Sequence, residues 1–152
     1  MKVKPIYLLA ILPVLFACNL STSEKKQKLV GDVWKVNEAG DSVIYRYDEK
    51  SKLLSFTTYK NGRKHGVGKK FFEDGKAEYV IRYEDGFKNG LTSWYYKTGK
   101  LYRETHYKNG FQHGLQKRYY ENGKLQAEIP YDMGEVKPGV KEYLKSGKVK
   151  TN

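Results

Sequence analysis

Apolar and polar residues alternate over short stretches of the chain, and residues 77–83 show this most clearly. Every second residue there is apolar or aromatic: Ala77, Tyr79, Ile81 and Tyr83. The stretch at 125–131 repeats the alternation with Leu125, Ala127, Ile129 and Tyr131. A period of two predicts half-buried β-strands rather than helices.

Turn signals separate these stretches and fall into two sets. The first set is Asp74-Gly75, Thr98-Gly99, Asn122-Gly123 and Ser146-Gly147. The second set is Asn61-Gly62, Asp85-Gly86, Asn109-Gly110 and Met133-Gly134. Asn-Gly and Asp-Gly favour type I′ turns, because both central residues of that turn have positive φ. The chain is therefore predicted to form successive β-hairpins, with a two-residue loop at Asn122-Gly123.

A two-residue loop in the first set of turns fixes which residues face each other across the strands. At Asn122-Gly123 it places Tyr120 opposite Leu125 and Arg118 opposite Ala127. One unit earlier the predicted pairs are Tyr96 with Leu101, Tyr95 with Tyr102 and Trp94 with Arg103. Such cross-strand pairs contribute roughly 0.2–1 kcal/mol each.

The strands and turns recur with a period of 24 residues. An aromatic residue opens each unit: Tyr47, Phe71, Tyr95, Tyr119 and Tyr143. The complete units are 47–70, 71–94, 95–118 and 119–142, and a partial unit starts at 143. A period of this length indicates a repeat architecture whose stability is roughly a sum over neighbouring units. We therefore predict an all-β fold for residues 47–152, an elongated antiparallel single-layer sheet of repeated β-hairpins. Residues 31–46 are predicted to form a divergent hairpin that caps the array, with Val33 and Trp34 over the first edge.

The start of the chain has the pattern of an export signal. Residues 1–17 combine Lys2 and Lys4 with an apolar run that is too short to span a membrane. The run ends Leu15-Phe16-Ala17-Cys18 and then turns polar, which resembles a bacterial lipobox. The resemblance implies cleavage before Cys18 and a thioether link from its thiol to diacylglycerol, with residues 18–30 as a lipidated tether. The alternative is an ordinary thiol near a cleaved signal. Because Asn19 is not acidic, the outer membrane is favoured over the inner one.

The repeat columns resemble a known family. The pattern YYENGKL followed by Tyr-Lys-Asn-Gly is similar to the variant MORN repeats of many bacterial proteins, and the rows that start at Tyr95 and Tyr119 match it best. The resemblance implies a single-layer antiparallel sheet of hairpins. Many members are described as similar to the YwqK-type antitoxin component of a toxin–antitoxin pair. Typical MORN repeats are associated with protein scaffolding and with lipid headgroups.

The composition of the chain excludes several classes of protein. The chain has 152 residues, a net charge of +12, one Cys and 14% aromatic residues. These values exclude a multi-span membrane protein and a disulfide scaffold, and they argue against simple disorder. No nucleophile, phosphate loop or metal-ligand motif stands out, so we expect no enzyme activity, no metal and no cofactor. His65, His106 and His113 are predicted to be turn and surface residues. Lys117 is predicted to lie opposite Glu128 as a surface ion pair.

One Lys column and several tyrosines are the candidate binding residues. The lysines that follow the first-set glycines are Lys76, Lys100, Lys124 and Lys148, and they would line one edge of the sheet. They could bind an anionic lipid or glycan, or they could be solvated turn residues. Tyr95, Tyr102 and Tyr119 are candidate interaction aromatics. The first hypothesis is a non-catalytic lipoprotein of the cell envelope that acts as a protein-interaction module, with a cognate toxin as one candidate partner. The alternative is a membrane- or glycan-binding module, and nucleic acid is not expected for an exported protein.

Overall fold

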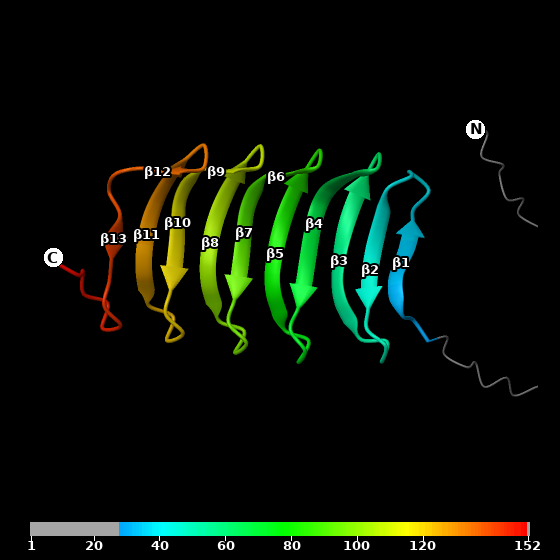
Figure 1. Cartoon of the computed structure of the whole chain (residues 1–152), viewed down its shortest axis with the longest axis horizontal. Helices are drawn as coiled ribbons and strands as arrows, with labels where there is room; N and C mark the ends of the chain where they lie inside the picture. The colour runs from blue at the N-terminus through cyan, green and yellow to red at the C-terminus, as the bar shows by residue number, and fades with distance from the viewer. Residues whose placement is uncertain (1–27, 152) are drawn as a thin grey trace, which may run out of the picture.

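The computed structural model describes residues 28–151, which form one open antiparallel sheet (Figure 1). The signal segment 1–17 and Cys18 lie outside the described residues. The strands are β1 (Gly31–Val36), β2 (Ser42–Tyr47), β3 (Leu53–Lys60), β4 (Arg63–Phe71), β5 (Ala77–Glu84), β6 (Phe87–Lys88), β7 (Gly90–Tyr95), β8 (Leu101–Lys108), β9 (Phe111–Gln112), β10 (Gly114–Tyr119), β11 (Leu125–Asp132), β12 (Glu135–Val136) and β13 (Lys141–Glu142). Within the described range, no helix is long and apolar enough to cross a bilayer.

The strands follow one another across the sheet in chain order, as hairpins require. The order is β1-β2-β3-β4-β5-β7-β8-β10-β11-β12. Three short strands share a neighbour with the strand that follows them. β6 and β7 both pair with β5, β9 and β10 with β8, and β12 and β13 with β11. Each such pair lies end to end and serves as one interrupted strand, so every unit supplies two strands to the sheet.

The predicted fold class is confirmed. β5, β8 and β11 begin at Ala77, Leu101 and Leu125, which are 24 residues apart. Figure 1 shows the strands side by side in a single layer, with β1 at one end and β13 at the other. Among the described residues, no second layer covers either face.

The first set of turns differs from the predicted type. At residues 72–76, Gly75 N donates to Phe72 O at 2.9 Å and Phe72 N donates to Lys76 O at 2.8 Å. Gly75 has a φ of 86° and Asp74 is not left-handed. This is a three-residue loop, a type I turn that ends in a glycine bulge. The Asp74 side chain stabilises it by accepting a hydrogen bond from Lys76 N at 3.0 Å. The predicted two-residue loop at Asn122-Gly123 is therefore wrong, since residues 120–124 repeat the same hydrogen bonds.

The glycine bulge explains why some of the predicted cross-strand pairs are observed and others are not. Arg118 lies opposite Ala127 and Trp94 lies opposite Arg103, as predicted. Next to the turns the extra residue shifts the register by one position. The observed pairs there are Tyr119 with Leu125 and Tyr95 with Leu101. The predicted pairs Tyr120 with Leu125, Tyr96 with Leu101 and Tyr95 with Tyr102 are therefore wrong.

The second set of turns has the type I′ geometry. Asn109 and Gly110 have φ values of 48° and 89°, and Lys108 pairs directly with Phe111. The same arrangement holds at Met133, whose φ is 49° although Met has no local preference for this conformation. The two-residue loop matches the twist of the flanking strands. Beyond it the register shifts by two positions, from Lys108 opposite Phe111 to Arg103 opposite Arg118.

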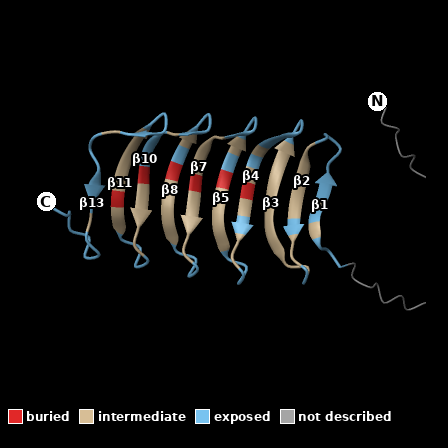
Figure 2. Cartoon of the chain, viewed as in Figure 1, coloured by how far each residue is buried: buried red, intermediate tan, exposed pale blue. Residues whose placement is uncertain are grey.

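Burial is concentrated in a narrow band across the middle of the sheet (Figure 2). Only Ile81 and Ala127 are buried apolar residues among those described, at 8% and 7% exposure. Thr92, Thr105 and Gln116 are more deeply buried, at 0–1%. The register aligns Gly68 with Ile81, Thr92 with Thr105, and Gln116 with Ile129.

Because directly paired residues share a face, this band defines one face of the sheet. We call it the threonine face. Four tyrosines lie on the same face, each two positions further along its strand than the buried band: Tyr59, Tyr83, Tyr107 and Tyr131. At the N-terminal end of this face, the Trp34 ring lies 6.3 Å from the Tyr59 ring. The sequence predicts Trp34 over the first edge of the sheet, but its ring packs on the threonine face instead.

Two glycines in the same repeat column should respond differently to Ala. Gly66 and Gly114 have φ values of 86° and 77°, so Ala at either site costs about 1–2 kcal/mol in backbone strain. At Gly114 an added Cβ meets nothing within 4 Å, whereas at Gly66 it lies 2.8 Å from Thr58 Oγ1. That hydroxyl is held in place because it accepts from Val67 N at 2.7 Å.

We therefore expect Gly66→Ala to lower the free energy of unfolding by at least about 1 kcal/mol more than Gly114→Ala does. Urea unfolding followed by far-UV circular dichroism measures both values. Equal losses at the two positions would show that the contact with Thr58 is not rigid.

Candidate functional site

The four candidate lysines lie in the turns at one edge of the sheet, the lower edge in Figure 1. Lys76 Nζ is 3.0 Å from Asp74 Oδ2 and donates to Lys97 O at 3.3 Å. Lys124 Nζ donates to Ser146 O at 2.7 Å. Two of the four ammonium groups therefore hold one turn to the turn of the next unit. This structural use was not expected from the sequence.

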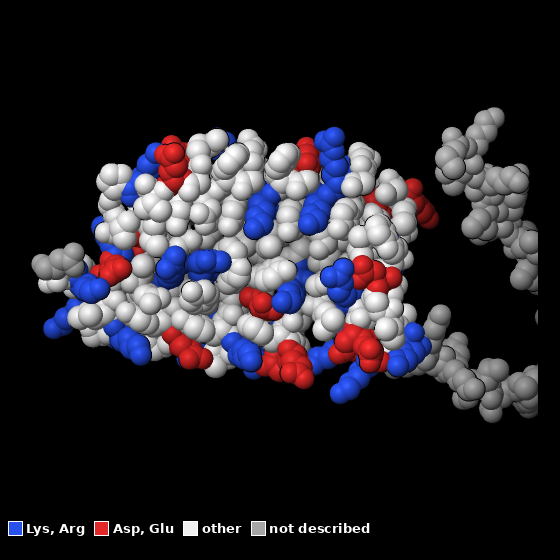
Figure 3. Space-filling model, viewed as in Figure 1, with Lys and Arg blue, Asp and Glu red and all other residues white. Residues whose placement is uncertain are grey.

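The same turns also carry acidic side chains. Glu73, Asp74 and Glu121 lie in them with the lysines, and Asp48 lies in the equivalent turn of the first unit. In Figure 3, Lys and Arg side chains alternate with Asp and Glu side chains along the lower margin of the molecule. The Lys column thus lies on an edge of mixed charge.

The three candidate tyrosines are all half-buried and do not form one patch. Tyr119 OH donates to Glu104 Oε2 at 3.0 Å on the face opposite the threonine face. Tyr102 packs edge-on against Tyr96, with ring centroids 5.1 Å apart. Tyr95 lies opposite Leu101. Part of this aromatic surface therefore holds the units together rather than facing solvent.

Burial, together with the hydrogen bond to Glu104, raises the pKa of Tyr119 to about 12. An unperturbed tyrosine in the unfolded chain has a pKa of about 10. The folded state therefore holds this proton more tightly. The protonated Tyr119 hydroxyl therefore stabilises the folded state fully below about pH 10, and this stabilisation is lost as the pH rises toward 12.

Tyr119→Phe should therefore flatten part of the loss of stability between about pH 10 and pH 12, as measured by urea midpoints. Tyr95→Phe is the matched control, since Tyr95 fills the same column but has Val80 where Tyr119 has Glu104. The account of this contact is wrong if both variants lose stability with pH as steeply as the parent chain does.

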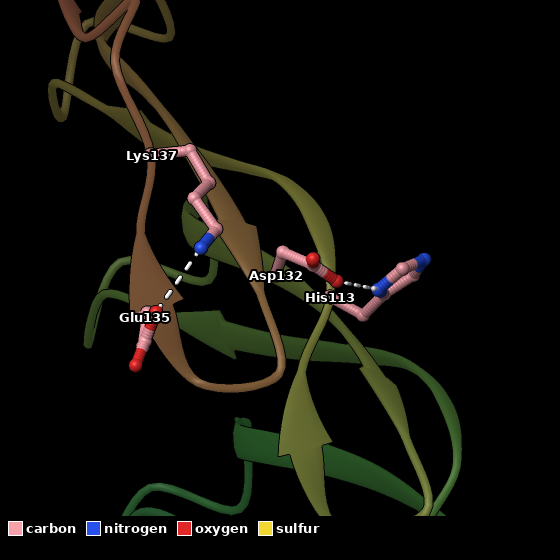
Figure 4. Close-up of polar contacts among 4 residues, drawn as sticks. All are labelled: His113, Asp132, Glu135 and Lys137. Atoms are coloured by element: carbon pink, nitrogen blue, oxygen red, sulfur yellow. Dashed lines mark hydrogen bonds and ion pairs between the residues drawn. The ribbon is translucent and has the colours of Figure 1, made fainter.

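Basic and acidic side chains form exposed pairs at the upper edge of the sheet, and Figure 4 shows two of these pairs. His113 Nδ1 lies 3.1 Å from Asp132 Oδ1, and Lys137 Nζ lies 3.0 Å from Glu135 Oε2. His65 Nδ1 lies 3.7 Å from Asp85 Oδ1, which is too long for a hydrogen bond. Within residues 28–151, no three His, Cys, Asp or Glu side chains converge as metal ligands would.

Lys117 lies opposite Glu128 as predicted. The predicted ion pair is wrong, because the Glu128 carboxylate instead accepts a hydrogen bond from Tyr143 OH at 2.8 Å. This contact is the Tyr119–Glu104 contact displaced by one unit. Both pairs bind one unit to the next on the face opposite the threonine face.

Two arginines that the sequence analysis did not select lie directly opposite each other on the threonine face. Arg103 on β8 pairs in register with Arg118 on β10. The Arg103 guanidinium stacks 3.8 Å from the Trp94 ring. Nε of each arginine is buried and has no hydrogen-bond partner in the described part of the chain. Figure 3 shows basic side chains side by side over β8 and β10 without an acidic side chain between them.

Other basic residues on this face do have acidic partners. Arg46 Nε lies 2.7 Å from Asp32 Oδ1, and Lys70 Nζ lies 2.9 Å from Glu78 Oε2. Arg46, Lys70 and Arg118 occupy the same repeat column. Arg118 lines an open cleft of about 300 Å³ with Glu142 and Lys150, but those two residues pair with each other at 2.8 Å. Arg103 and Arg118 belong to the same unit and meet between β8 and β10, two positions out of the register that Lys108 and Phe111 set at the turn. Counting residues from the turn therefore does not bring them together, and the sequence alone carries no signal for this site.

Comparison with known families agrees with the geometry. The family model described as MORN repeat variant matches residues 88–109 and 112–133. These two stretches of the chain are MORN-variant repeats, and they include Arg103 and Arg118. No curated protein matches the chain significantly.

Proposed function

We propose that this chain is a non-catalytic lipoprotein of the bacterial cell envelope and that its repeat sheet is a protein-interaction module. MORN-variant repeats, which the chain contains at 88–133, are often found in modules that mediate protein or membrane interactions. The observation that carries the proposal is the single-layer sheet, because the described residues leave both faces without a covering layer.

The threonine face suits protein recognition in particular. Its centre is a row of buried polar residues, Thr92, Thr105 and Gln116, where a sheet packed on a second layer would carry apolar residues. Tyrosines at 24-residue spacing flank the row. Tyr side chains give a large contact area at a low cost in conformational entropy. A partner would meet a surface that is already formed.

The alternative, binding of an anionic membrane or glycan by the Lys column, receives less support. Lys76 and Lys124 bind carbonyls of the next turn, and the Asp74 carboxylate lies 3.0 Å from Lys76 Nζ. Replacing Lys76, Lys100 and Lys124 by Gln should therefore leave a protein partner bound. Loss of binding to anionic vesicles in this triple variant, with no protein partner found, would favour the alternative.

The narrower parts of the proposal concern the anchor and the partner. Cys18 is proposed to carry the lipid that holds the chain at a membrane, with the outer membrane favoured. A cognate toxin, as for YwqK-type components, is the narrower proposal for the partner. Co-expression of a toxin-like neighbouring gene with and without this chain tests it, and unchanged toxicity would exclude an antitoxin role.

The module itself is tested by affinity capture of the full chain from detergent-solubilised membranes. We expect one protein in stoichiometric amount, retained at high salt. Retention at high salt distinguishes a packed interface from exposed charge attraction, which salt screens. Recovery of no stoichiometric protein at either salt concentration would contradict the proposal.

A further inference from the structure

The two arginines on the threonine face, Arg103 and Arg118, lie directly opposite each other and have no acidic partner among the described residues. Like charges directly opposite each other on neighbouring strands destabilise a sheet. Arg103 and Arg118 are nevertheless in direct register on β8 and β10. Within residues 28–151, the ion pairs all use other residues. The structure thus carries a local electrostatic cost that a bound anion would relieve.

The neighbouring carboxylates are engaged elsewhere. Glu104 accepts from Tyr119, and Glu128 accepts from Tyr143, both on the opposite face. Glu142 lies 2.8 Å from Lys150, and Glu78 lies 2.9 Å from Lys70. No described acidic side chain therefore neutralises the two guanidinium groups.

Unmet hydrogen-bonding groups also gather at this place. Five buried side-chain polar atoms have no partner among the described residues, and four of them belong to this part of the threonine face: Thr92 Oγ1, Arg103 Nε, Gln116 Nε2 and Arg118 Nε. Buried polar groups are normally satisfied, by water where no protein group serves, so this concentration marks a place where the groups of the sheet do not complete their own hydrogen bonding. The donors of an arginine fork match a carboxylate with two parallel hydrogen bonds.

One member of the pair, Arg103, is held in place. The ring of its cross-strand neighbour Trp94 stacks 3.8 Å from the Arg103 guanidinium, which limits the rotation of that group. Both arginines are half-buried rather than fully exposed. A guanidinium that is already ordered loses less entropy when it binds.

From these observations we propose that Arg103 and Arg118 form the binding site for an acidic segment of a polypeptide partner. A Glu or Asp carboxylate of that segment lies between the two guanidinium groups, and the tyrosines of the threonine face contact the rest of the segment. The proposal rests on the proposed interaction module and names the chemistry of its partner. Charge complementarity at a single point, rather than a basic stripe along the edge, selects the partner.

The test is a fluorescence anisotropy titration of the full chain in neutral detergent. The probe is a labelled peptide of alternating Glu and Gly, and the same peptide with Gln in place of Glu is the reference. We expect Arg103→Gln and Arg118→Gln each to weaken binding of the acidic peptide at least about tenfold, as for loss of a charge-assisted bidentate pair. Lys117→Gln is the matched control, because it removes the same charge from β10 on the opposite face, and it should change affinity less than about twofold.

Two further variants separate specific recognition from attraction by charge. Arg103→Lys and Arg118→Lys keep the charge but lose the fork, so we expect both to bind the acidic peptide more weakly than the parent chain. Arg118→Gln should unfold at the same or a higher temperature, since it removes like-charge repulsion. The proposal is overturned if the double Gln variant binds the acidic peptide as the parent does. It is also overturned if the arginines contribute only to binding of vesicles that contain phosphatidylglycerol.

The inference and the interaction module can fail separately. If affinity capture recovers the same stoichiometric protein with the double Gln variant, the arginine site is wrong and the module stands. If the parent chain captures no protein, the module fails regardless of the peptide result.

Discussion

Removal of residues 81–104, one repeat length taken from mid-strand to mid-strand, is expected to leave a folded sheet. The deletion joins Val80 to Thr105, which occupies the position of Ile81 in the next unit. Thr105 keeps its contact with Gln116, and its side chain stays on the threonine face. Because each unit contacts mainly its neighbours, the shortened array should unfold cooperatively with a lower midpoint in urea. Its m-value should fall with the surface that is lost.

Removal of residues 81–103, which is one residue shorter, should abolish the cooperative transition. Glu104 would then take the position of Ile81, whose side chain is only 8% exposed, so a carboxylate would be buried there. The residues that follow would change face, because alternation in a strand has a period of two. Far-UV circular dichroism and size-exclusion chromatography compare the two deletions. Equal stability of both would contradict a fold that depends on the 24-residue register.

Cys18→Ala is expected to move the protein from the membrane fraction to the soluble fraction if its anchor is the proposed lipid. Two or three acyl chains contribute about 0.8 kcal/mol for each buried CH₂ group, so their loss removes nearly all membrane affinity. Ultracentrifugation of cell extracts with immunoblotting measures the distribution. Ser21→Ala is the matched control, since it changes a nearby residue in the tether and should stay with the membranes. Retention of Cys18→Ala in the membrane fraction would contradict the anchor.

The sequence alone was sufficient to predict the all-β single-layer sheet, because the period of two within strands and the 24-residue period between units both leave direct marks on it. It was not sufficient to predict the loop at residues 120–124. Asn122-Gly123 satisfies a two-residue type I′ turn and a three-residue turn with a glycine bulge equally well. Backbone hydrogen bonds such as Gly123 N to Tyr120 O decide between them. The register errors at Tyr95, Tyr96 and Tyr120 all follow from that one ambiguity.

The candidate site was less accessible from the sequence. Columns of the repeat show which residues are equivalent, and this made Lys76, Lys100, Lys124 and Lys148 conspicuous. They do not show which residues meet between units. The contacts of Lys76 and Lys124 with the next turn, and the pairing of Arg103 with Arg118, depend on side-chain direction and on register between hairpins. Arg103 also breaks the repeat, because its column holds Tyr79 and Ala127 in the neighbouring units, so a column of recurring residues does not reveal it.

The central claim is that the threonine face binds a protein, and photo-crosslinking tests it most directly. Tyr107 and His106 are neighbours on β8 whose side chains point to opposite faces, with Tyr107 on the threonine face and His106 exposed on the other. A photoreactive benzoylphenylalanine is placed at one position or the other in the full chain, and the cells are irradiated. We predict that the probe at 107 yields an adduct with one protein and that this adduct is lost with Arg103→Gln and Arg118→Gln, whereas the probe at 106 yields none. An adduct from 106 alone, or no adduct from 107, would contradict the account.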